Sequence, residues 1–376
     1  MELKEYRFDE VTINFDKKRI PLSGAQRKKR QGNFRYYGAQ GVIDHIDDFI
    51  FDGTYLLIAE DGENLKSKKQ NIAQVVEGQF WVNNHAHIVQ GNELCNTRYL
   101  CYLLNSMDLS GYVTGSAQPK LSQANLNAVT LFLPSITVQE RIVESLYLFD
   151  KKIAVNQKIN DNLYAQAKAI FEQQFIDLET IPDGWKKGNL LDIANYLNGL
   201  AMQKYRPNED EVGLPVLKIK ELRQGSCDNS SELCSPNIKP EYIIHDGDVI
   251  FSWSGSLLVD IWCGGTCGLN QHLFKVTSNT YDKWFYYLWT AHHLERFIAI
   301  AADKATTMGH IKRGELAKAE VLIPSDEDYK SINSLMNPIF NLIVAKQIEA
   351  RKLAELRDEL LPKLMSGEID VSEVSL

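Results

Sequence analysis

The stretch from Lys17 to Arg35 carries the residues best placed to do chemistry, because it is a cluster of cations that could bind phosphate. It contains eight basic residues and no acid, with glycines and glutamines among them and aromatic residues following. The run has one sign and no helical spacing, so we expect a loop that contacts phosphate. A solvated surface loop is the alternative, since most charge runs are solvated. Lys66, Lys68 and Lys69 form a second basic cluster.

Two short motifs resemble parts of catalytic sites, but the sequence lacks the other residues that those sites need. Asn337-Pro-Ile-Phe340 looks like the Asn-Pro-Pro-Phe of adenine methyltransferases, but its third position is Ile339 and it lies in a helical pattern. No glycine-rich cofactor loop follows a strand, which disfavours a methyltransferase. Asp328-x-Lys330 has no suitable Pro-Asp on a preceding strand, which disfavours a nuclease. No Gly-x4-Gly-Lys-Ser/Thr loop is present, which disfavours an ATP-driven motor in this chain.

The cysteines and histidines do not indicate a metal site. The six cysteines form no CxxC pair and no Cys/His cluster at zinc spacing, so we expect idle thiols in a reducing cytoplasm. His85 and His272 head equivalent apolar strands, which indicates a shared structural hydrogen bond. No segment resembles a signal peptide or a membrane span, so we expect a cytoplasmic protein without membrane contact.

A repeat organises the chain. Leu121, Leu126 and Pro134 recur with the same spacing as Ile311, Leu316 and Pro324, and each set predicts a short helix, an apolar strand and a proline. The period is far too long for a solenoid. It therefore predicts two copies of one globular domain, related by a pseudo-two-fold axis.

A long helical segment follows each copy. Val138 to Phe175 contains no Gly or Pro, and apolar residues recur there at helical spacing. Such a segment would span about 57 Å. We expect Asn156 and Asn160 to form a polar patch on a partly exposed helix, or alternatively a register-setting polar layer. Pro338 should kink or break the second helix.

These elements predict an α+β fold, in which two similar α+β domains are separated by two long antiparallel helices. The expected domains are residues 1–136 and 179–326, the spacer helices are 137–178 and 327–365, and a C-terminal tail covers 366–376. The expected apolar seam of the second helix is Ile332, Leu335, Ile339, Leu342, Leu353, Leu356, Leu360 and Leu364.

The order domain, helix, domain, helix resembles the specificity subunit of type I restriction–modification systems over nearly the whole chain. Two parts depart from the family pattern. The first helix lacks a counterpart of the tail that ends the second helix, and the first domain lacks a counterpart of the motif that opens the second domain. The motifs that carry the resemblance are Tyr36-Tyr-Gly-Ala-Gln-Gly41, Leu121-x12-Pro134, Ile181-Pro-Asp-Gly-Trp185, Ile311-x12-Pro324 and Leu360-Leu-Pro-Lys-Leu-Met-Ser-Gly-Glu-Ile369.

The resemblance implies a non-catalytic subunit that reads DNA. Each domain would read one half of an interrupted double-stranded target, and the helices would set the spacer and dock two methyltransferase subunits. Those partners would hold S-adenosylmethionine, and a restriction and translocation subunit that uses ATP and Mg can join them, so this chain would hold no cofactor itself.

Base reading requires amides and guanidinium groups at the groove with cations around them. The candidates for DNA binding are Lys28, Lys29, Arg30, Arg35, Gln40, Gln118, Lys120 and Gln123 in the first domain and Lys218, Arg223, Thr306, Thr307, His310, Lys312 and Arg313 in the second. The net charge of −8 mildly favours an alternative, a two-domain protein scaffold that never touches DNA. Filter binding at two salt concentrations would separate the two, because phosphate binding weakens steeply with salt.

Overall fold

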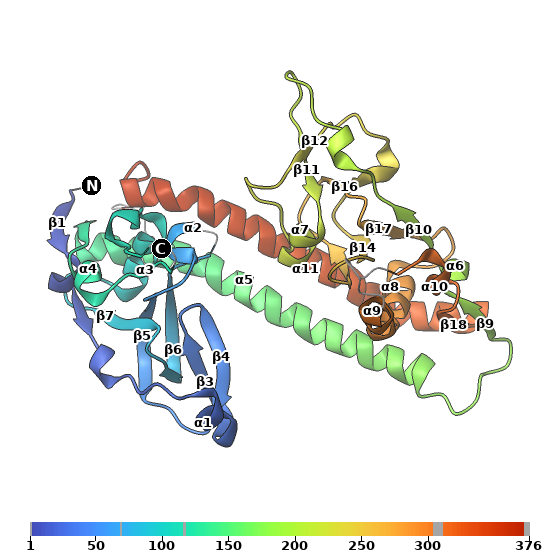
Figure 1. Ribbon diagram of the computed structural model, residues 1–376, viewed down its shortest axis with the longest axis horizontal. Helices are drawn as coiled ribbons and strands as arrows, with labels where there is room; N and C mark the ends of the chain where they lie inside the picture. Colours follow the sequence, from blue (N-terminus) through green and yellow to red (C-terminus); the bar gives the residue numbers. More distant parts are fainter. Residues whose placement is uncertain (1, 68–69, 116–117, 304–310, 372–376) are drawn as a thin grey trace. The chain divides into compact units, whose positions relative to one another are not determined.

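The computed structural model describes residues 2–67, 70–115, 118–303 and 311–371. The chain divides into two compact units, which Figure 1 shows in sequence colours. Unit 1 comprises Met1–Asp150 and Glu355–Leu376, and unit 2 comprises Lys151–Ala354. Within the described residues, no helix is both long and apolar enough to cross a membrane.

Unit 1 is built on a six-stranded sheet of order β2-β7-β5-β6-β3-β4, in which only the β3–β6 pairing is parallel. A separate antiparallel pair, β1–β8, brings the start of the unit to its end. The strands are β1 Lys4–Arg7, β2 Thr12–Asn14, β3 Gln31–Gly38, β4 Gly41–Ile46, β5 Phe51–Ala59, β6 Ala73–Val82, β7 Ala86–Gly91 and β8 Thr130–Leu133. The short helices are η1 Phe8–Glu10, η2 Asp16–Lys18, α1 Gly24–Lys29, α2 Asn64–Ser67, α3 Thr97–Ser106, η3 Ser110–Tyr112 and α4 Gln123–Asn127.

Helix α3 covers the sheet of unit 1, because a capping residue defines its start and one of its faces is apolar. The side chain of Asn96 caps it by accepting hydrogen bonds from the amides of Arg98 and Tyr99. Tyr99, Leu100 and Leu104 are buried in the same core as strand β5. This confirms the α+β pattern expected from the sequence.

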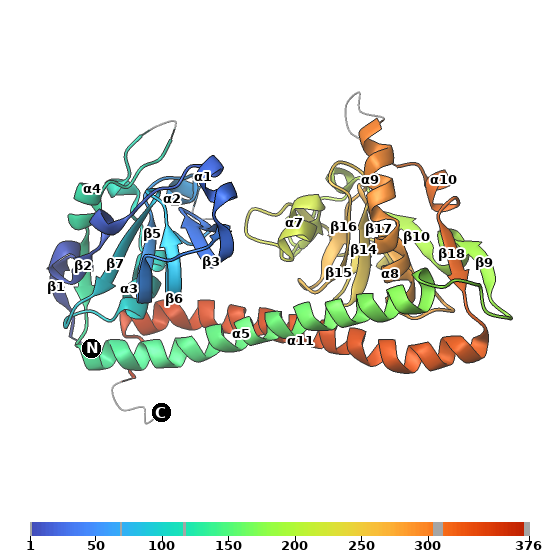
Figure 2. The ribbon, with the colours of Figure 1, turned by 90° about the horizontal axis from the view of Figure 1, so that it is seen from below.

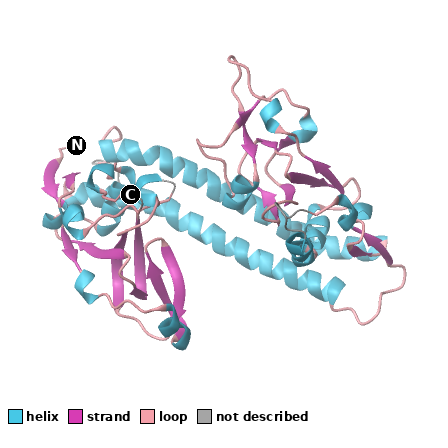
Figure 3. Cartoon of the chain, viewed as in Figure 1, coloured by secondary structure: helices cyan, strands magenta, loops and turns pink. Residues whose placement is uncertain are grey.

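Unit 2 contains two four-stranded sheets, β10-β17-β14-β15 and β12-β11-β16-β13, and the pair β18–β9. Figure 3 shows the mixture of helix and strand. The strands are β9 Lys186–Asn189, β10 Asn195–Asn198, β11 Leu214–Leu217, β12 Leu233–Cys234, β13 Ile243–Ile244, β14 Asp248–Ser252, β15 Leu258–Trp262, β16 Cys267–Leu269, β17 Leu273–Thr277 and β18 Glu320–Ile323. The short helices are α6 Leu190–Ile193, η5 Met202–Lys204, α7 Ile219–Gln224, η6 Pro240–Tyr242, α8 Lys283–His292, α9 Leu294–Asp303 and α10 Arg313–Leu316.

An aromatic core holds unit 2 together. Trp284 and Phe285 of α8 pack with Phe251 of β14 in one buried cluster, beside the sheet that Figure 2 shows next to α8. The indole of Trp185 donates a 2.8 Å hydrogen bond to Asp328 at the start of α11. The Pro-Asp-Gly-Trp motif therefore joins the segment before β9 to the start of α11, and Asp328 has a structural role.

The repeat holds at the level of single hydrogen bonds. The amide of Leu121 donates to the carbonyl of Glu60 at 2.8 Å, and the amide of Ile311 donates to the carbonyl of Trp253 at 3.1 Å. The pairs β1–β8 and β9–β18 are both antiparallel and four residues long. The two copies therefore share a backbone framework.

Helix α5 runs from Ile136 to Phe171 and ends in a π-helical turn, η4 Glu172–Ile176. Helix α11 runs from Asp326 to Ser366. The first part of α5 packs with the last part of α11 in unit 1, and the opposite ends pack together in unit 2. The helices are thus antiparallel, as expected.

Pro338 does not break the second helix, because α11 is continuous through that residue. The expectation of a break is therefore wrong. Met336 and Phe340, on either side of it, are fully buried in the aromatic core. Their burial offsets the roughly 3 kcal/mol that a proline costs inside a helix.

The expected seam of α11 is also partly wrong. Leu335, Leu342 and Leu356 are 59%, 42% and 49% exposed. The buried positions of the first turns are Ile332, Met336, Phe340 and Ile343. This face is offset from the predicted one because the helix packs on the aromatic core of its own unit and not only along another helix.

Asn156 and Asn160 are buried, so the expected exposed polar patch is wrong. Neither side-chain amide atom of Asn156 has a hydrogen-bond partner among the described residues. Asn160 lines a pocket of about 300 Å³ together with Tyr164 and Gln347. The two residues are buried within unit 2, and Asn160 lies beside Gln347 of α11, as a polar layer between the helices requires; that this layer sets their register stays a prediction.

Candidate nucleic-acid interface

The basic run contains a short helix, which corrects the expectation of a non-helical loop. Ser23 and Gln26 form a capping box, in which the Gln26 side chain accepts from the Ser23 amide at 2.8 Å. This cap starts α1, whose last turn carries Arg27, Lys28 and Lys29.

Acids from outside the run neutralise much of its charge. Arg27 pairs with Asp44 at 2.9 Å, and Arg30 pairs with Asp47 at 2.9 Å. Hydrogen bonds from Gln31 and Arg27 hold the pKa of Asp44 below its ordinary value.

Lys28 and Lys29 are the free cations of this helix. Both are exposed, and neither has an ion pair within the part of the chain that the structure describes. By contrast, the guanidinium of Arg30 lies 5.0 Å from the ring centre of Trp81 and is half-buried. The two lysines are therefore the side chains of α1 best able to meet a phosphate.

Gln40 follows the other end of β3, about 23 Å from α1 along the strand. The segment with Gln118 and Lys120 lies close to it, because the amide of Gly62, which is beside the Gln40 side chain, donates to the carbonyl of Pro119 at 3.2 Å. The Gln40 amide donates to the Asn64 side chain at 3.3 Å. Lys120 pairs with Glu60 at 3.2 Å and, like Gln118, is exposed. The first-domain candidates thus form two groups, one at each end of this strand.

The backbone fixes the segment that carries Gln118 and Lys120. Thr114 and Lys120 exchange two 2.8 Å backbone hydrogen bonds. Gly115 has a φ of 85°, and a Cβ there would meet the carbonyl oxygen of Gln118 at 2.3 Å. This position therefore requires glycine. We call residues 118–121 the recognition loop.

The remaining first-domain candidates lie between these two groups or beside the recognition loop. Arg35 lies on β3 and donates to the Glu77 carbonyl at 2.7 Å, with its guanidinium over the ring of Tyr37. Gln123 is the exposed first residue of α4, and only Ser122 separates it from the recognition loop.

The second-domain candidates are split between two elements. Arg223 belongs to α7, and Lys218 is the residue just before that helix and pairs with Glu232 at 2.6 Å. Lys312 and Arg313 are exposed at the start of α10. Thr306, Thr307 and His310 lie outside the described residues.

The equivalent histidines have the shared structural role that the repeat indicated. The amides of His85 and His272 donate to the side chains of Asn83 and Asn270, at 2.8 and 3.2 Å. The Nδ1 atom of His85 donates to Asp61 at 2.7 Å. The Nδ1 atom of His272 is 3.0 Å from the hydroxyl of Ser254.

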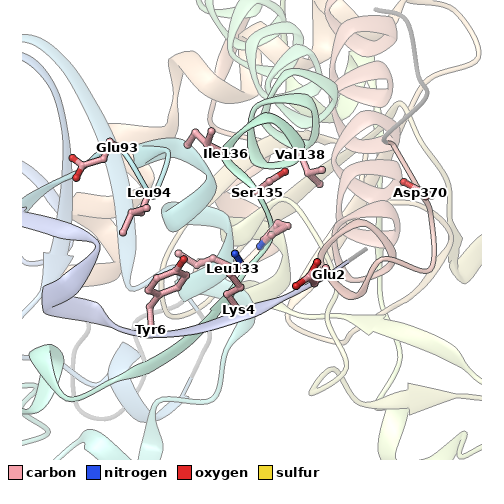
Figure 4. Close-up of a pocket in the computed structure, with 11 residues that line it drawn as sticks. Glu2, Lys4, Tyr6, Glu93, Leu94, Leu133, Ser135, Ile136, Val138 and Asp370 are labelled. Carbon is pink, nitrogen blue, oxygen red and sulfur yellow. The ribbon is translucent and has the colours of Figure 1, made fainter.

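Other features of the surface do not suit an anion or a metal. A pocket of about 470 Å³ at the start of α5, drawn in Figure 4, is lined by Glu2, Glu93 and Asp370 but by only one cation, Lys4. Among the described residues, no group of His, Cys, Asp or Glu could hold a metal ion, and the cysteines are free thiols.

A buried charged group behind the recognition loop did not emerge from the sequence. Arg19 pairs with Glu60 at 3.0 Å, and His87 lies fully buried close by. Burial raises the pKa of Glu60, but Arg19, His87 and Lys120 together hold it below its ordinary value. The available signal was a second histidine two residues after His85, on the inward face of the same strand.

Comparisons with known proteins agree with this architecture. Residues 2–165 and 182–357 each match the family described as type I restriction modification DNA specificity domain. The MjaIX specificity subunit of a type I restriction enzyme from Methanocaldococcus jannaschii is 27% identical over 307 residues, covering 74% of this chain and 70% of that protein. The EcoBI specificity subunit from Escherichia coli is 23% identical over 211 residues, covering 54% and 43%.

The fold is also that of a solved structure. The S subunit of a type I restriction–modification system from M. genitalium aligns with a TM-score of 0.60 and 13% identity, covering 97% of this chain and 96% of that one. Since the family matches almost the whole chain in two consecutive segments, the chain belongs to the type I restriction–modification DNA specificity family and carries its domain twice.

Proposed function

We propose that unit 1 and unit 2 each read one half of an interrupted DNA target for a type I restriction–modification complex. The observation that carries this proposal is the shared framework with different loops. Leu121 and Ile311 make the same backbone hydrogen bond, yet the residues around them differ. Two related readers in one chain fit a target with two separated parts.

Catalysis would reside in partner chains. The family resemblance supports methyltransferase subunits that hold S-adenosylmethionine and methylate adenine, and a restriction subunit that uses ATP and Mg. In this chain the amide of Asp328 donates to the Ser325 hydroxyl at the start of α11, and Phe340 packs in the core of unit 2, so the sequence motifs that include them have structural roles. The chain would contribute target choice and no chemical step.

The exposed apolar residues of the long helices would dock the methyltransferase subunits. Leu335, Leu342 and Leu356 lie at multiples of seven along α11, and Leu148 and Val155 are seven apart on α5. All five are at least 42% exposed. Exposed apolar residues in regular rows on a helix are typical of protein interfaces.

The long helices would also set the distance between half-sites. Each helix belongs partly to unit 1 and partly to unit 2, with boundaries at Asp150 and Ala354. A helix rises about 1.5 Å per residue. The number of residues in both helices would therefore determine which spacer length the two units can read.

Two double variants test the division of labour. Gln118→Ala with Lys120→Ala alters the residues just before Leu121 in unit 1, and Lys312→Ala with Arg313→Ala alters the residues just after Ile311 in unit 2. Methylation by the assembled complex is measured on duplexes mutated in each half-site in turn. A lost base contact should cost about 1–3 kcal/mol at one position, and a lost phosphate contact should weaken all sequences alike.

Each double variant serves as the control for the other. The proposal requires the first to change recognition of one half only and the second to change the other half only. If either variant relaxed both halves equally, or if neither changed affinity or preference, these segments would not be the readers.

A further inference from the structure

His87 and Asp16 form a buried pair directly behind the recognition loop. The Nδ1 atom of His87 is 2.6 Å from the Asp16 carboxylate, and its Nε2 atom is 2.9 Å from the carbonyl oxygen of Leu121. The His87 side chain is 1% exposed and that of Asp16 is 4% exposed. A carbonyl oxygen can only accept, so Nε2 must carry hydrogen.

The Nδ1 contact then also needs a proton. If His87 were neutral and Asp16 ionised, a ring lone pair would face a carboxylate oxygen at 2.6 Å. The pair must therefore hold one extra proton. Arg19 lies 3.5 Å from the same carboxylate oxygen, and the amide of Ile88 donates to the other at 2.8 Å. Both favour the ionised carboxylate and hence a buried imidazolium.

We propose that His87 is a positioning residue for the recognition loop: its doubly protonated ring holds the Leu121 carbonyl, so the loop that carries Gln118 and Lys120 loses its fixed position as this proton leaves. The proposal rests on the proposed DNA-reading function of that loop. It adds a regulation, because the half-site preference of unit 1 should depend on pH in the alkaline range.

The surrounding charges determine the direction of the pH effect. Burial lowers the pKa of His87, but the hydrogen bonds to Asp16 and Leu121 and the charges of Asp16 and Glu60 outweigh it, so the net pKa is above the ordinary value. Arg19 and Lys120 are the other charged groups of this cluster, and both pair with Glu60.

Because the pKa of His87 is higher in the folded chain, the stabilisation by its protonated ring is fully present below the pKa of the unfolded chain, near 6.5. This stabilisation is lost as the pH rises through the pKa of the folded chain. Loop protection should therefore fall on the alkaline side. For Asp16 burial is the largest influence and raises its pKa, but His87 and the Ile88 amide outweigh it, so its part of the stabilisation is lost only at acid pH.

Unit 2 provides an internal comparison. His272 is equivalent to His85, so the residue equivalent to His87 is Phe274, two positions further along each strand. Phe274 packs among Phe251 and Tyr196 and cannot titrate. The pH dependence should therefore affect one half-site and spare the other.

Amide hydrogen exchange of the full-length chain tests the positioning role without DNA. Exchange in a peptide containing Gln118 to Asn125 is measured from about pH 6 to about pH 9 and corrected for the intrinsic rate. Above the midpoint, the protection of these amides from exchange should fall about tenfold per pH unit, because the fraction of His87 that is protonated falls by the same factor. Nitrogen NMR of the His87 ring should show hydrogen on both nitrogens near neutral pH.

The key variant is Asp16→Asn, which keeps the size of the side chain and lets an amide donate to neutral His87. It should keep the loop protected and shift the pH midpoint down or abolish it. His87→Phe, the residue type of unit 2, should lower protection at every pH. His45→Gln is the control, because His45 is an exposed histidine of the same unit.

A flat pH profile in the unaltered chain, a ring with hydrogen on only one nitrogen, or an unshifted midpoint in Asp16→Asn would overturn the positioning role. None of these results would bear on whether the loop reads DNA. That link is tested by methylation with the assembled complex, where His87→Phe should weaken discrimination at one half-site only. Unchanged discrimination with a disordered loop would overturn the link to DNA reading.

Discussion

Replacing Lys28 and Lys29 by alanine should reduce the salt dependence of DNA binding without unfolding unit 1. Both side chains are exposed at the end of α1 and have no ion pair within the described residues. Each phosphate contact contributes about 0.9 to the slope of log affinity against log salt, so losing two should lower the slope by about 1.8. Between about 50 and 200 mM salt, the double variant should therefore lose about 12-fold less affinity than the unaltered chain.

The assay is equilibrium binding of the assembled complex to a target duplex and to an unrelated duplex over a series of salt concentrations. Both duplexes should show the same change in slope, because phosphate contacts carry no sequence information. Thermal unfolding should be unaffected by the double variant.

Arg30→Ala is the contrast, because Arg30 is already neutralised by Asp47 and Asp48 and stacks on Trp81. It should lower thermal stability and change the salt slope little. An unchanged slope in the lysine variant, together with a reduced slope in Arg30→Ala, would refute this assignment of the phosphate contacts.

Three further predictions address the helices and the entry to unit 2. Inserting one heptad after Asp150 and one after Ala354 should add about 10 Å, or about three base pairs, to the gap between half-sites. Alternatively, the insertion should abolish binding because it rotates one unit away from its groove. An unchanged gap with full methylation would show that the helices do not set the spacer length. Trp185→Phe should lower the free energy of unfolding of unit 2 by about 1–2 kcal/mol in calorimetry and leave the methylated sequence unchanged, because it removes one hydrogen bond to a carboxylate. Leu335→Arg with Leu342→Arg should abolish methyltransferase binding in size-exclusion chromatography at an unchanged melting temperature; retained binding would place the docking surface elsewhere.

The sequence predicted the elements that depend on local pattern. The repeat of Leu121 and Pro134 as Ile311 and Pro324 is a sequence periodicity, and both copies have the expected short helix, strand and long helix. Such patterns are readable because each residue's neighbours in sequence decide the outcome.

Features that depend on distant residues were not predictable. Asp44 and Asp47 neutralise Arg27 and Arg30 only because β4 lies beside α1, and nothing in the basic run indicates this. The face of α11 that is buried was misassigned for the same reason, since the aromatic core of unit 2 and not the heptad pattern determines it. α1 itself was readable, because Ser23 and Gln26 have the spacing of a capping box.

His87 shows the limit most clearly. In the sequence it is one histidine on an apolar strand, and its charge depends on Asp16 and on the carbonyl of Leu121, which lie far away along the chain. Only the folded structure shows that two hydrogen-bond acceptors, the Asp16 carboxylate and the Leu121 carbonyl, face the His87 ring.

The most direct test of the two-reader account is to sequence modified adenines in the genome of a host that carries this chain and its methyltransferase. The account predicts methylation at a single interrupted sequence with a fixed gap, and a change in one half only when Gln118 and Lys120 are replaced by alanine. Methylation at an uninterrupted sequence, or a change in both halves from that one double variant, would contradict it.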